Sequence, residues 1–140
     1  TDNGEKYDIK LAKTRIREMS EKYGFHIELD KKVHEMSVSE KQTVEIIKVL
    51  YRGADILILD EPLSGVDIEG SYTLMEMLDE LRQDYDLSIL MTTHDFGMLP
   101  RYADAVVLID HGIIAQGSPQ DVLNSDGFRK VFHRKGGDQA

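Results

Sequence analysis

Two adjacent carboxylates, Asp60 and Glu61, directly follow the four apolar residues 56–59 in the stretch ILILDEPLSGVD. Such a run is typical of a buried strand, whose last side chains emerge at the carboxyl edge of a sheet, where α/β folds bind their ligands. Neighbouring side chains on a strand point to opposite sides, so the two acids cannot share one task. The pattern favours Asp60 as a carboxylate for hydrated Mg²⁺ and Glu61 as a group that orients or deprotonates an attacking water. The alternative is that two acids simply end a strand in solvent.

A second apolar run, SILM at 88–91, is followed by TTHD and places His94 at the tip of its strand. Beside a Mg²⁺-nucleotide site this imidazole could donate to a γ-phosphate oxygen, whereas a single strand-end histidine is more often a bystander. The sequence has no nucleophile elbow for Ser-His-Asp chemistry and no paired histidine spacing for zinc.

The first 55 residues predict helices. Apolar residues at three- and four-residue steps predict an amphipathic helix over 8–23. Ser37 and Glu40 stand three apart ahead of an apolar run, which predicts a capping box and a second helix ended by Gly53. Residues 1–55 are therefore interpreted as a helical portion that precedes an α/β portion at 56–140.

The α/β portion alternates short apolar runs with helix-length segments. Expected strands are 56–59, 88–91, 105–109 and 113–116, and expected helices are 68–84, 96–102 and one capped by Ser118. Runs without polar alternation predict a mostly parallel sheet with helices on both faces.

Composition limits the function classes. The 140 residues suffice for one domain and include 17 basic and 26 acidic side chains, for a net charge of -9. The scattered positive charges lack interleaved aromatics, which argues against nucleic-acid binding. The apolar runs are far shorter than the roughly 20 residues that span a bilayer, so we expect a soluble protein that reaches a membrane only through a partner. The absence of cysteine excludes disulfides and thiolate metal sites.

Four ordered motifs resemble those of the nucleotide-binding subunits of ABC transporters, especially importers. ILILDE resembles Walker B, SGVD the D-loop, TTHD the switch-histidine segment and MSVSEKQ, at 36–42, the signature. The resemblance implies a P-loop NTPase core that binds ATP and Mg²⁺ between two domains arranged head to tail. It also implies transmembrane permease subunits as partners and a cytoplasmic position at the inner face of the membrane. The implied catalytic residues are Glu61, as the base, and His94, which contacts the γ-phosphate, and Asp60 is the implied Mg²⁺ ligand. The implied cofactor-binding residues are Ser37, Ser39 and Asp67, of which Asp67 also couples the two domains across the dimer.

The sequence departs from the family pattern in two ways. The signature lacks both glycines, which are replaced by Val38 and Ser39, and has Glu40 and Thr43 where the family usually has glutamine and arginine. A phosphate loop, G-x-x-x-x-G-K-[ST], is absent, and so is the strand that would lead into it. We therefore expect the carboxyl-terminal part of such a domain, which does not bind or hydrolyse ATP alone and needs a second domain or chain to supply the phosphate loop.

Two structural questions remain open from the sequence. In the resembled fold the missing strand lies between the strand before His94 and the strand at 105–109. Either these two strands close up, or another chain fills the slot, including a second copy that pairs with the open edges. The sequence also resembles sugar or nucleoside importers up to Pro62 and metal-ion importers from Leu63. This favours, as an alternative function, a non-catalytic α/β fragment or an engineered chimera.

Overall fold

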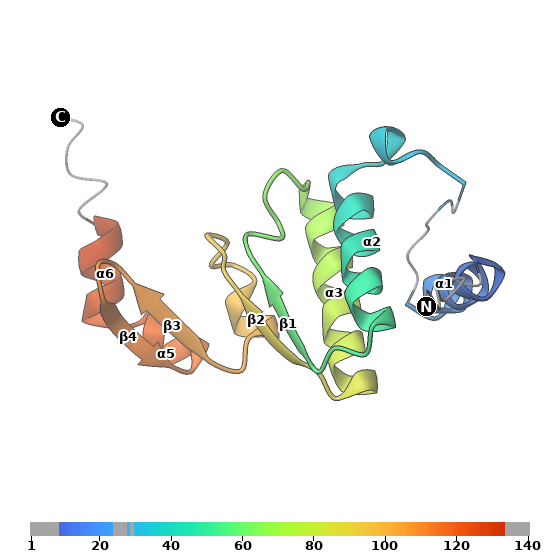
Figure 1. Ribbon diagram of the computed structural model, residues 1–140. Coiled ribbons are helices and arrows are strands. Elements are labelled where there is room, and N and C mark those ends of the chain that lie inside the picture. The colour runs from blue at the N-terminus through green and yellow to red at the C-terminus, as the bar shows by residue number, and fades with distance from the viewer. Residues whose placement is uncertain (1–8, 24–27, 29, 134–140) are drawn as a thin grey trace, which may run out of the picture. The chain divides into compact units, whose positions relative to one another are not determined.

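A computed structural model describes residues 9–23, 28 and 30–133 (Figure 1). The chain divides into two compact units, 1–93 and 94–140. The predicted boundary between a helical and an α/β portion, at 55/56, lies inside the first unit and stays a prediction. No helix in the described ranges is both long and apolar enough to cross a membrane.

The first unit contains one pair of parallel strands and the longer helices. Its elements are α1 (Ile9–Tyr23), a 3₁₀ turn (Val33–Glu35), α2 (Val38–Tyr51), β1 (Ile56–Leu59), α3 (Ile68–Tyr85) and β2 (Ser88–Met91). β1 pairs with β2 from Ile56 opposite Ser88 to Leu59 opposite Met91. In Figure 1, α3 lies between α2 and the strand pair. The predicted α/β arrangement, with α3 as a crossover between parallel strands, is confirmed.

The core of this unit forms where α2, α3 and β1 pack together. Its buried members are Ile46, Ile47, Leu57, Leu74, Met77, Leu78 and Leu81. Helical spacing on α3 places its apolar residues on one side. Leu57 is 3% exposed and belongs to this core, whereas Ile58, the next residue of β1, is 72% exposed.

One face of the strand pair is open within the described residues. Ile56, Ile58 and Leu90 are all more than 60% exposed. The prediction that helices cover both faces is therefore wrong for this pair, because α2 and α3 both lie on the Leu57 side. All four residues of β1 are apolar, but only one of its two faces is buried.

The helix α1 is joined to the end of α3 by one carboxylate. Asp84 Oδ2 accepts a hydrogen bond of 2.6 Å from the Tyr23 hydroxyl and lies 2.8 Å from Lys22 Nζ. Burial and the bond to Asp84 raise the pKa of Tyr23 to about 12. The end of α1, predicted from its periodicity, is thus tied to α3.

The second unit is built on an antiparallel pair. Its elements are α4 (Leu99–Tyr102), β3 (Val106–Ile109), β4 (Ile113–Gly117), α5 (Pro119–Leu123) and α6 (Asp126–His133). β3 pairs antiparallel with β4, and the turn between them includes His111 at φ 57°. The ring of Phe96 lies 5.3 Å from that of Phe128 and 4.7 Å from that of Phe132, measured between centroids.

One prediction needs correction in this unit. The helix expected over 96–102 is only α4, because Asp95 Oδ1 accepts a bond from the Gly97 amide in a preceding turn and Pro100 is confined to the first helical turn. β2 and β3 belong to separate two-stranded sheets, one in each unit. Both expectations for the vacant strand position, closure of these two strands and occupation by another chain, stay predictions.

Candidate functional site

The carboxyl ends of β1 and β2 are joined through one hydroxyl. Thr92, the first residue after β2, donates from Oγ1 to Asp60 Oδ1 at 2.6 Å and accepts from the Glu61 amide at 2.9 Å. The Thr92 amide donates to Leu59 O at 2.9 Å and continues the parallel ladder. Because the strands are parallel and in register, the side chains that follow them meet at the same edge. Hydrogen bonds to Thr92 therefore hold the predicted pair of acids at the edge of the sheet.

The backbone turns sharply at the second acid. Glu61 has φ 46°, in the left-handed region that non-glycine residues seldom occupy. The turn is closed by the Ser64 amide, which donates to Glu61 O at 3.0 Å, and Pro62 is fully buried. Asp60 is exposed and Glu61 is half-buried. The two neighbouring acids therefore differ in their exposure to solvent.

The start of α2 carries the predicted signature residues. Ser37 caps the helix: its Oγ accepts from the Glu40 amide at 3.2 Å, and the Glu40 carboxylate accepts from the Ser37 amide at 2.6 Å. The predicted capping box is confirmed. Ser39 Oγ lies 3.1 Å from Ser37 Oγ, so the two candidate cofactor-binding hydroxyls are adjacent.

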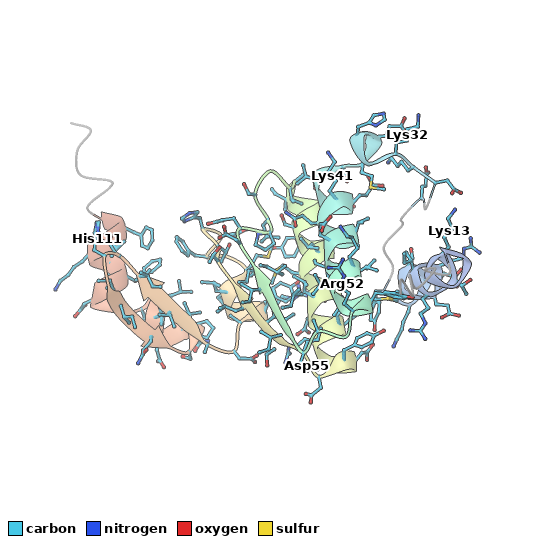
Figure 2. The ribbon with its side chains drawn as sticks, in the orientation of Figure 1. Lys13, Lys32, Lys41, Arg52, Asp55 and His111 are labelled. Atoms are coloured by element: carbon cyan, nitrogen blue, oxygen red, sulfur yellow. The ribbon has the colours of Figure 1, made fainter. Side chains whose placement is uncertain are left out.

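The charge of Glu40 is compensated within this segment. Lys31 Nζ lies 3.1 and 3.2 Å from the two Glu40 carboxylate oxygens, and both side chains are about three-quarters buried. The Ser37 amide, followed by the weaker effect of Lys31, holds the pKa of Glu40 below its usual value of 4.5. The neighbouring Lys32, labelled in Figure 2, is exposed. Glu40, which stands where the resembled signature has glutamine, is thus bonded to the amide of the helix cap and to a lysine.

Asp67 lies close to the signature residues. It caps α3 by accepting from the Gly70 amide at 2.7 Å. A β-carbon added at Gly70 would lie 2.7 Å from Asp67 Oδ1 and 3.6 Å from Ser39 Cβ. The starts of α2 and α3 therefore approach closely, and the three predicted cofactor-binding residues, Ser37, Ser39 and Asp67, lie there.

His94 is the first residue of the second unit and is exposed. Its predicted contact with a γ-phosphate stays a prediction. Among the residues that the structure describes, no group of three or more His, Asp or Glu side chains is arranged to hold a metal ion. The donor set at the strand ends, the exposed Asp60 carboxylate beside the Thr92 hydroxyl, nevertheless suits Mg²⁺. This ion prefers oxygen ligands and often keeps several waters while binding one or two carboxylates.

Sequence reasoning missed two residues of this region. Thr92 was visible as the first polar residue after β2, but only the pairing register shows that it meets Asp60 and Glu61. Lys31 precedes the helix cap by six residues, and no periodic pattern links it to Glu40.

Comparison with solved structures defines the fold class. CbiO1 of Clostridium perfringens, part of the ABC transporter complex CbiONQ, matches with a TM-score of 0.72 and 31% identity over 95% of this chain and 55% of that one. An ATP-binding cassette of an ABC transporter in its ADP conformation matches with a TM-score of 0.75 over 88% of this chain and, at 21% identity, supports the fold alone. The fold is that of the α/β P-loop NTPase domains found in ABC ATPases.

The sequence comparisons agree. The family model described as ABC transporter matches residues 2–64. The zinc import ATP-binding protein ZnuC of Marinobacter nauticus is 35% identical over 74% of this chain and 40% of its own length. The nucleoside import ATP-binding protein NupA of Lactococcus lactis is 40% identical over 75% of this chain and 21% of its own length. The chain is thus similar to ATP-binding subunits of ABC importers, and it spans less than half the length of these two curated relatives.

Proposed function

We propose that this chain forms part of the ATP-binding subunit of an ABC importer and acts in an assembly that supplies a phosphate loop. The observation that carries the proposal is the junction of Asp60, Glu61 and Thr92 at the ends of two parallel strands. Ligands of open α/β sheets bind at this edge. The relatives' names indicate ATP-dependent import.

Each residue then has a distinct task. Asp60, exposed at the sheet edge, holds hydrated Mg²⁺, which neutralises charge on the phosphates. Glu61 orients the attacking water and accepts its proton. His94 contacts the γ-phosphate.

The signature helix serves the neighbouring half of the assembly. Its first amides and the hydroxyls of Ser37 and Ser39 face a terminal phosphate, which the positive end of the helix dipole favours. Asp67, which caps α3 near Ser39, couples the two nucleotide-binding domains across the dimer.

The partners follow from the same assignment. The assembly contains a second nucleotide-binding domain, or another chain that bears the phosphate loop, together with transmembrane permease subunits on whose cytoplasmic side this chain docks. CbiO1, a structural relative, is itself part of a transporter complex. The 140 residues contain no G-x-x-x-x-G-K-[ST] motif, so this chain alone holds Mg-ATP only weakly and does not hydrolyse it.

Two measurements test the proposal. Isothermal titration of the chain alone with Mg-ATP should show no tight binding, and micromolar affinity would overturn the assignment. Coexpression with the phosphate-loop portion of the zinc-import relative should give ATP turnover that Glu61→Gln lowers by about 100- to 10,000-fold, the usual contribution of a general base. Glu80→Gln, at an exposed acid of α3, is the matched control and should leave turnover unchanged.

The second candidate function is a non-catalytic α/β scaffold. The missing phosphate-loop motif favours it. A stably folded chain whose coexpressed assembly shows no turnover, or turnover that is indifferent to Glu61→Gln, would select the scaffold instead.

A further inference from the structure

The Thr92 hydroxyl occupies a bridging position between the two strand-end acids. It is 2.6 Å from Asp60 Oδ1 and 2.9 Å from the Glu61 amide nitrogen, across separations of 32 and 31 residues in the chain. The first distance lies in the range of bonds from hydroxyls to carboxylates. One side chain directly after β2 thus bonds to the Asp60 carboxylate and to the Glu61 backbone amide.

The direction of both hydrogen bonds follows from counting protons. A threonine hydroxyl has one hydrogen and two acceptor lone pairs, whereas a backbone amide can only donate. The Glu61 amide must therefore donate to Thr92 Oγ1, and the single hydroxyl hydrogen points to Asp60 Oδ1. This arrangement fixes one oxygen of the Asp60 carboxylate, so the carboxylate plane has a set orientation.

The same hydroxyl supports an unusual backbone conformation. Glu61 has φ 46°, and left-handed conformations of non-glycine residues persist where the surroundings hold them. The fully buried Pro62 holds the residue on one side, and the bond from the Glu61 amide to Thr92 holds it on the other. Loss of the hydroxyl would release the amide and loosen the turn that aims the Glu61 side chain.

We propose that Thr92 is a positioning residue for the Asp60–Glu61 pair: its hydroxyl ties both acids to the end of β2 and sets the directions in which they face Mg²⁺ and the attacking water. The catalytic part of this inference rests on the proposed function. Its geometric part concerns the chain alone and is tested separately.

The first test uses the chain alone. Thr92→Val keeps the shape of the side chain and removes both hydrogen bonds, whereas Thr92→Ser keeps the hydroxyl. Amide hydrogen exchange followed by NMR should show the Glu61 amide exchanging about 5-fold faster in Thr92→Val, the size expected for one hydrogen bond, and at the original rate in Thr92→Ser. Thr73→Val removes a hydroxyl that donates to Glu69 O within α3, and this matched control should leave the Glu61 amide unchanged. Unchanged exchange in Thr92→Val would overturn the proposal.

The second test uses the coexpressed assembly. Thr92→Val should lower kcat about 10- to 100-fold, the range found when a group that orients a metal site is removed. KM for ATP should change by less than about 2-fold, because the hydroxyl acts on the orientation of the acids rather than on nucleotide binding. Thr92→Ser should restore kcat.

The two failures are distinguishable. ATP turnover that does not change in Glu61→Gln contradicts the proposed function. In that case the amide exchange experiment alone tests whether Thr92 holds the Glu61 amide. Turnover that is abolished by Glu61→Gln but unchanged in Thr92→Val contradicts the positioning role alone.

Discussion

The start of α2 and the carboxyl ends of β1 and β2 both gather polar side chains, but they hold them in different ways. At the start of α2, Ser37, Glu40 and Lys31 bond to partners at most nine residues away. At the strand ends, Thr92 reaches acids more than 30 residues away. The first arrangement needs one helical turn, whereas the second needs β1, α3 and β2 to pack in register. Core damage should therefore disturb the acids before it disturbs the helix cap.

The largest effect is expected from truncation of the β1 core residue. Leu57→Ala removes a side chain that is 3% exposed and should lower the free energy of unfolding by about 2–5 kcal/mol, through lost transfer free energy and the cavity left behind. Urea unfolding followed by circular dichroism measures this loss. Ile58→Ala, at the 72% exposed neighbour, should change stability by less than about 0.5 kcal/mol. Equal losses in both variants would mean that the open face of the strand pair is covered in solution.

The next effect concerns the helix cap. Ser37→Ala removes the acceptor for the Glu40 amide and should cost about 1 kcal/mol of unfolding free energy. The amide exchange rate of Glu61 should stay the same, because the cap is local. Ser64→Ala, at an exposed serine of the loop after β1, is the control for side-chain removal. A change at Glu61 in Ser37→Ala would show that the two regions are coupled.

A smaller effect is expected from the lysine beside the cap. Lys31→Met should lower stability by about 0.5 kcal/mol, since both partners of the pair are partly exposed and the solvent screens them. Lys32→Met, at the exposed neighbour, should have no measurable effect. The loss in Lys31→Met should shrink further in high salt, and a loss independent of salt would contradict an ionic origin.

The smallest expected effect is the pH dependence of the stability that the Glu40 carboxylate contributes at the cap of α2. The Ser37 amide and Lys31 lower the pKa of Glu40 in the folded chain, so its carboxylate contributes stability above the ordinary value of 4.5. That contribution should disappear as the pH falls through the lowered folded pKa. The stability difference between the original chain and Glu40→Gln, measured from pH 7 downward, should therefore begin to narrow as the pH approaches 4.5 and should narrow further below it. A difference that is constant over this range would contradict the role of the charge.

The features that sequence reasoning recovered are local or periodic. The capping box follows from the three-residue spacing of Ser37 and Glu40, and β1 and α3 follow from their apolar patterns. Pairing partners depend on distant packing, so the bridge made by Thr92 could not be predicted.

The second unit shows a related limit. The strands β3 and β4 were expected, and the three-residue turn 110–112 accounts for their antiparallel pairing. The helix α6 went unrecognised because its eight residues include Gly127, a weak helix former. Gly127 is nevertheless suited to its place, since an added β-carbon would lie 2.6 Å from Ile114 Cγ2.

The open side of the β1–β2 pair has a thermodynamic consequence. Ile56, Ile58 and Leu90 are already hydrated in the folded chain, so melting exposes less new apolar area than in a domain with both sheet faces covered. The heat-capacity increment of melting should then fall below the roughly 12–15 cal/mol/K per residue of ordinary globular proteins. The free energy of unfolding would then change little with temperature. Its maximum would be shallow, and the chain would stay folded over a broad range of temperatures on either side of that maximum.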